Sequence, residues 1–111
     1  MQSKNSSQNN PEVMQLTNLV DYQTGSVVSR TLIKKDKGTL TLFAFDKGEA
    51  LSEHTVPFDA FVYIIDGEAT ITIDKQSYQL TTGNALILPA NRPHSVKAIK
   101  RFKMLLTMIR S

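Results

Sequence analysis

From about Ser26 onward, apolar and polar residues alternate with a period of two, the pattern of strands that bury one face. Residues 39–45 and 69–73 alternate almost strictly, and turn residues follow each of them. Residues 60–65 form a continuous apolar run rich in β-branched and aromatic side chains, and the tight turn Asp66-Gly67-Glu68 is expected to end it. Further strands are expected over residues 77–80, 85–88, 95–99 and 102–109.

The chain therefore contains roughly eight or nine short strands at close spacing, with no convincing amphipathic helix between them. Residues 16–22 are compatible with one helical turn or with a leading edge strand. A barrel and a two-sheet sandwich both bury one face of every strand in such a sequence. The predicted fold class is all-β.

Composition narrows the class of protein. The 111 residues are 41% hydrophobic and 21% charged, which fits one soluble globular domain over residues 12–111, preceded by a disordered polar tail over residues 1–11. The chain has no cysteine, so disulfides and thiolate nucleophiles are excluded. It has no apolar run of the length that a membrane helix needs and no apolar stretch typical of a secretory signal, so a cytoplasmic location without membrane contact is expected.

The net charge of +3 is unevenly distributed. Most of the acidic residues lie between Asp46 and Asp74, whereas the segment from Arg92 to the end contains bases and no acid. These bases are spread along strand-like sequence without stacking aromatics among them, so no nucleic-acid partner is expected. Complementary charges on neighbouring strands explain the distribution more simply.

Two segments carry a pattern of spaced residues. Residues 48–68 contain Gly48, His54 and Gly67, and residues 83–98 contain Gly83, Pro89 and His94. In spacing, the two segments resemble the two conserved motifs of the cupin superfamily, and the resemblance extends over about residues 38–109. It implies a small cupin-type β-barrel, also called a double-stranded β-helix or jelly roll, with a short N-terminal extension. The ending of the chain is similar to that of small, single-domain bacterial cupins.

The departures from the cupin pattern concern the metal ligands. The family uses three histidines and one glutamate, but Val56 stands at the position of the second histidine and Ala60 at that of the glutamate. Asn91 replaces a motif glycine and Ala98 the final asparagine. The resemblance therefore implies an incomplete metal-ligand set, in which His54 and His94 remain.

Strand alternation and the resemblance together place the candidate site inside the barrel. Alternation puts Ser52, His54 and Val56 on one face, and His94, Val96 and Ala98 on one face of another strand. In cupins these strands are antiparallel neighbours, so the two imidazoles are expected to face each other. The candidate ligand-binding residues, including the two candidate catalytic histidines, are His54, His94, Ser52, Val56, Ala60 and Ala98.

Three interpretations of the histidine pair stay open. In the first, His54 and His94 bind a divalent metal such as zinc, nickel, iron or manganese, with a third ligand from Glu53, Asp59, solvent or the bound molecule. In the second, neutral imidazoles line a pocket for a small polar molecule, and one of them acts as a general acid or base. In the third, the pair is structural and the barrel is a scaffold.

The expected function is binding of a small polar molecule in the barrel, with histidine- or metal-assisted chemistry as an extension. A non-catalytic binding, sensor or scaffold protein without metal is the alternative, because this fold supports both enzymes and binding modules. A homodimer is expected as well, since sheet edges need covering.

Overall fold

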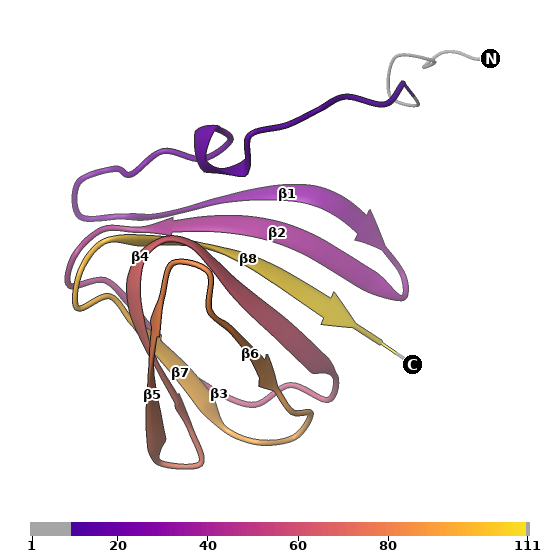
Figure 1. Ribbon diagram of the computed structural model, residues 1–111. Coiled ribbons are helices and arrows are strands. Elements are labelled where there is room, and N and C mark those ends of the chain that lie inside the picture. The colour runs from indigo at the N-terminus through magenta and orange to yellow at the C-terminus, as the bar shows by residue number, and fades with distance from the viewer. Residues whose placement is uncertain (1–9, 111) are drawn as a thin grey trace.

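The computed structural model describes residues 10–110. A 3₁₀ helix, η2 (Leu16–Asn18), precedes eight strands (Figure 1). They are β1 (Val27–Lys35), β2 (Gly38–Phe45), β3 (Ala50–His54), β4 (Asp59–Ile73), β5 (Gln76–Thr81), β6 (Ala85–Leu88), β7 (His94–Lys97) and β8 (Phe102–Ile109). The all-β prediction is confirmed, and residues 16–22 contain the helical turn rather than an edge strand. The expected disordered tail falls mostly on residues 1–9, which lie outside the described part of the chain.

All strand pairs are antiparallel, and the strands follow the order β1-β2-β8-β4-β7-β3, with β5 and β6 also paired to β4. The first half of β4 pairs with β8 and β6, and its second half with β7 and β5. Strand β4 thus belongs to two sheets, which curl toward each other (Figure 1). The barrel-like shape depends on this one long strand.

The turn expected at residues 66–68 is absent, because β4 continues through this segment without interruption. A bulge between Ile64 and Asp66 bends the strand where it passes from one sheet to the other. Gly67 follows with φ +86°, a conformation that glycine adopts without strain. A Cβ at this position would lie 2.1 Å from the carbonyl oxygen of Arg101. The close approach of the neighbouring backbone is therefore a second reason why position 67 is glycine. The residues Asp66-Gly67-Glu68, which predict a turn in the sequence, therefore belong to the bend of β4.

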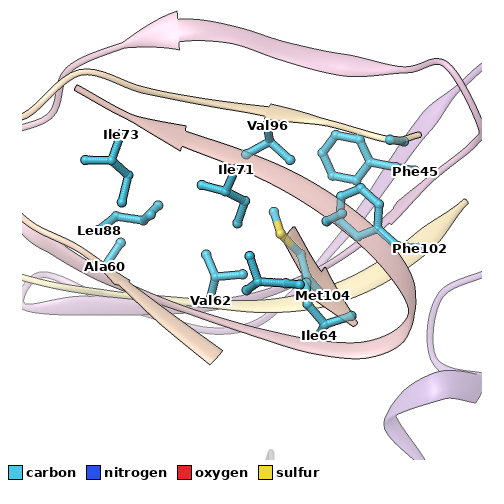
Figure 2. Close-up of a cluster of buried hydrophobic side chains, with 13 residues drawn as sticks. Phe45, Ala60, Val62, Ile64, Ile71, Ile73, Leu88, Val96, Phe102 and Met104 are labelled. Atoms are coloured by element: carbon cyan, nitrogen blue, oxygen red, sulfur yellow. The ribbon is translucent and has the colours of Figure 1, made fainter. Parts of the chain in front are cut away.

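The main core fills the space between the two sheets. Figure 2 shows Ile71 and Val96 pointing toward Val62 and Ile64 from the opposite side. All four side chains are at most 4% exposed. Phe45 and Phe102 stack with ring centroids 4.5 Å apart at one end of this core. Buried positions recur at every second residue in each half of β4, at 60, 62 and 64 and again at 69, 71 and 73, with the phase changing at the bulge, and these residues form its inward-facing apolar row.

A second, smaller apolar cluster lies on the outer face of β2 and β8, under the segment that precedes β1 (Figure 1). Val20 is 4% exposed and packs there with Leu42 and Ala44. The Lys103 ammonium donates to the carbonyl of Thr17 at 2.6 Å and fixes the segment to β8. Among residues 10–110, no helix has the length and apolar character needed to cross a membrane.

Candidate functional site

The two histidines lie opposite each other on neighbouring strands. His54 ends β3, His94 begins β7, and the two are paired in the antiparallel register. Their ring centroids are 4.4 Å apart, and the ring planes meet at 66° in an edge-to-face arrangement. The structure therefore brings together the two side chains that the cupin-like spacing singled out.

Each ring is oriented by the backbone carbonyl of the residue two positions before it. His54 Nδ1 lies 2.9 Å from the carbonyl oxygen of Ser52, and His94 Nδ1 lies 3.4 Å from that of Arg92. A carbonyl oxygen only accepts, so in these contacts Nδ1 carries the proton and donates. In a neutral imidazole Nε2 is then an acceptor with a free lone pair. Neither Nε2 has a hydrogen-bond partner among residues 10–110.

The surroundings of His94 keep it neutral. Its side chain is buried, with the residue 6% exposed. Burial lowers the pKa of His94, and the neighbouring His54 lowers it further because two imidazolium ions would repel each other. At neutral pH His94 therefore presents an unprotonated Nε2. His54 is an exposed residue at the rim of the same site.

The histidines form part of the wall of a small cavity of about 50 Å³. A single buried water needs roughly 10–15 Å³ of such volume, so the cavity has room for a few waters or a small chemical group. Apart from the two imidazoles its wall is apolar, and the lining residues are Leu51, His54, Val56, Ala60, Val62, Leu88, His94, Val96, Met104, Leu106 and Met108.

Four of the candidate residues, His54, His94, Val56 and Ala60, line this cavity, whereas Ser52 and Ala98 do not. A bulge explains Ser52: Leu51 pairs with Val96 and His54 with His94, so two residues of β3 oppose the single Ser95 of β7. Leu51 consequently turns inward, and Ser52 is exposed. Ala98 is buried in the core, 1% exposed, beyond the end of β7.

Sequence reasoning missed the contribution of β8 to the cavity. Met104, Leu106 and Met108 follow one another at every second position and all line the wall. Their alternation is visible in the sequence, within the strand expected over residues 102–109. The signal that was lacking is the pairing of β8 with β4, which places these side chains opposite Val62 and Ala60.

The donor set does not fit the metal centre typical of cupins. Val56 and Ala60 stand in the cavity wall at the positions of two ligands, and neither has a donor atom. The Asp59 carboxylate instead accepts from the backbone N–H of Ala90 at 2.8 Å. Within residues 10–110 no three His, Cys, Asp or Glu side chains gather as a metal site would require. Catalytic zinc sites usually have three protein ligands, and this chain brings two imidazoles together.

Comparison with known proteins agrees with the fold and the motifs. Residues 41–109 match the family model of the cupin domain. A conserved protein of unknown function from Streptococcus pyogenes is 35% identical, with 92% of this chain and 90% of that chain covered and a TM-score of 0.88. A cupin superfamily protein from Desulfitobacterium hafniense is 31% identical, with 92% and 94% covered and a TM-score of 0.87.

A cupin 2 conserved barrel domain protein from Leptotrichia buccalis is 38% identical, and the match covers 85% of this chain but 46% of the other, with a TM-score of 0.82. No curated protein matches the chain. The protein belongs to the cupin family, as a small cupin whose set of metal-ligand residues is incomplete.

Proposed function

We propose that this cupin binds a small molecule with an apolar body and a hydrogen-bond donor, such as a hydroxyl group, directed at the histidine pair. The observation that carries the proposal is the pair of free Nε2 atoms in the wall of an otherwise apolar cavity. Acceptor nitrogens in the wall of a cavity are complementary to a donating group. The apolar wall favours a hydrocarbon body, because burying apolar surface is favourable in proportion to its area.

This proposal refines the expectation of a polar ligand. A sugar or a dicarboxylate would leave most of its polar groups against Leu51, Val56, Leu88 and other apolar side chains, without partners. An unpaired buried polar group costs a few kcal/mol. A ligand whose single polar group pairs with the histidines therefore suits the cavity better.

Proton transfer by His94 is the second candidate function. The lowered pKa of His94 keeps its Nε2 unprotonated at neutral pH, as a general base requires. A ligand hydroxyl that donates to this nitrogen would lie in the geometry from which a base removes a proton. Binding is the step that both candidate functions share, and it is the one to test first.

The test compares butanol with its isomer methyl propyl ether, which cannot donate a hydrogen bond. Binding is followed by the ¹⁵N resonances of the histidine side chains and by thermal stability. We expect butanol to shift the Nε2 resonances and to bind more tightly than the ether. The preference corresponds to one hydrogen bond of about 1 kcal/mol, or roughly fivefold in affinity.

The control is the double variant His54→Leu/His94→Leu, which keeps an apolar cavity and removes both acceptors. Butanol should lose its advantage over the ether in this variant. Equal binding of both probes to the unaltered protein would contradict the proposal and leave the scaffold interpretation. Stoichiometric Zn²⁺ binding that displaces butanol and depends on both histidines would contradict it in favour of a metal site.

Two other expectations remain predictions. One is a cytoplasmic location. The other is a homodimer, which we propose forms through the outer face of β6, β4 and β8, where Ile87 is 60% exposed, Phe61 42% and Ile109 60%. Sedimentation of the protein and of Ile87→Lys would test the dimer: a dimer should dissociate in the variant, and a monomeric parent protein would refute it.

A further inference from the structure

A second cavity of about 190 Å³ lies where the β1–β2 hairpin meets the end of β8. Its wall contains three basic side chains, Lys34, Lys35 and Arg110, and one acidic side chain, Asp36. We call this cavity the basic pocket. Its excess of positive charge favours an anionic occupant.

The basic side chains of this pocket are available to a ligand. Within residues 10–110, none of Lys34, Lys35 and Arg110 has a carboxylate within 4.0 Å. The Arg110 guanidinium lies over the ring of Phe58, 5.0 Å from its centroid, and Phe58 also lines the pocket. This contact holds the guanidinium at the wall, and no carboxylate of residues 10–110 pairs with its N–H groups.

One residue that lines the basic pocket has an unsatisfied hydroxyl. Thr39 lines the pocket, and its Oγ1 is buried without a hydrogen-bond partner in the described part of the chain. A buried polar atom without a partner costs about 1–3 kcal/mol, so such atoms are rare in folded proteins. An oxyanion in the pocket would supply the missing acceptor after a small shift of the side chains that cover this hydroxyl.

One row of side chains connects the basic pocket with the histidine cavity. Across four antiparallel pairs of strands the register runs through Lys34, Thr39, Met108, Ala60 and Leu88. Directly opposed residues share one face of a sheet. Met108 lines both cavities and is their common wall.

The distance between the two cavities suits a short chain. Thr39 and Ala60 are two strands apart, which corresponds to roughly 10 Å at the usual strand spacing. Met108 is unbranched and flexible, and a side chain of this kind adapts its shape to a neighbour. An aliphatic chain of moderate length can therefore reach from one cavity to the other along this face.

We infer that the basic pocket binds the anionic group of the ligand, a carboxylate or phosphate, while the ligand's chain passes Met108 into the histidine cavity. The ligand class is then an aliphatic oxyanion with a donor group at its far end. This inference rests on the proposed function for the far end of the ligand, and on the basic pocket alone for the anionic end.

Four probes test the two ends separately: octanol, octanoate, ω-hydroxyoctanoate and inorganic phosphate. Calorimetry at low salt should give the tightest binding for ω-hydroxyoctanoate, about tenfold tighter than for octanol, because a charge-assisted hydrogen bond is added. Lys34→Met should weaken both carboxylates about fivefold and leave octanol unchanged. Lys97→Met, which removes the same charge from an exposed position on β7, is the matched control and should change nothing.

Thr39→Val separates binding from stability. Removing an unsatisfied hydroxyl should leave the thermal midpoint of the free protein unchanged or raise it, while carboxylate binding weakens. If both carboxylates bind no better than octanol, or if Lys97→Met weakens them as much as Lys34→Met does, the basic pocket is not the anion site. If phosphate and octanoate depend on Lys34 but octanol does not bind at all, the anion site stands and the proposed function of the histidine cavity fails.

Discussion

The two strands that carry the histidines differ in how firmly the fold holds them. Strand β7 is paired on both sides, with β4 and with β3, whereas β3 is the last strand in the order and, among residues 10–110, pairs with β7 alone. His94 accordingly is 6% exposed, and His54 is exposed. Strand β3 also contains the bulge, and β7 has a regular register against β4.

Because their strands are held differently, His94 and His54 are expected to play different roles in the site. His94 is a fixed, neutral acceptor on a strand that cannot move without disturbing the core. His54 lies on an edge strand, where a bulge and a single pairing partner leave the backbone more freedom to adjust. A ligand that enters the cavity would therefore meet a rigid acceptor on one side and an adaptable one on the other.

Replacing each histidine with alanine should lower the free energy of unfolding by different amounts. His94→Ala removes a buried side chain from the core wall and should cost about 2 kcal/mol of the free energy of unfolding. His54→Ala removes an exposed side chain at a strand end and should cost about 0.5 kcal/mol or less. Urea unfolding of the two variants measures both values, and equal losses would refute the distinction between the strands.

The bulge on β3 can be tested with two neighbouring residues. Leu51 lines the cavity, so Leu51→Ala should destabilise the protein by about 1 kcal/mol, less than the roughly 2–5 kcal/mol of a fully buried leucine because Leu51 is only partly buried. Ser52→Ala should be nearly neutral, since Ser52 is exposed. Regular alternation from His54 predicts the reverse pattern, with Ser52 inside. Thermal denaturation of the two variants separates these alternatives, and a larger loss for Ser52→Ala would contradict the bulge.

Strands β3 and β7 also show how much of the fold and of the site could be predicted from the sequence. Period-two patterning gave most strands nearly to the residue, and the cupin-like spacing placed His54 and His94 near each other. The bulges of β3 and β4 could not be predicted in this way, because a bulge adds one residue to a strand without changing the residue types that mark the strand. Without the bulge of β3, Ser52 was predicted to face the site, and without the bulge of β4, a turn was predicted at Gly67.

The cavity wall contributed by β8 also escaped prediction, for a different reason. Alternation shows which side chains of one strand share a face, but it does not say which strand lies beside it. Leu106 and Met108 reach the site because β8 lies between β2 and β4, a pairing of segments far apart in the chain. The basic pocket depends on this arrangement too, since Thr39 and Met108 are opposed across β2 and β8.

The pH dependence of stability should sharpen the contrast between the histidines. The folded state lowers the pKa of His94 below its ordinary value of 6.5, so the unfolded chain binds a proton more readily. The resulting contribution to stability is complete above pH 6.5 and is lost as the pH falls toward the lowered pKa of the folded state. We therefore expect the thermal midpoint to fall as the pH is lowered below about 6.5.

His94→Gln should remove this component of the pH dependence. His54→Gln should reduce it, because the repulsion between the two rings disappears while the burial of His94 remains. Thermal scans of the protein and both variants between pH 5 and pH 8 distinguish the contributions of burial and of repulsion. If His54→Gln abolished the dependence as completely as His94→Gln, repulsion from His54 rather than burial would be the main cause of the lowered pKa, and the rigid, desolvated character assigned to His94 would be wrong.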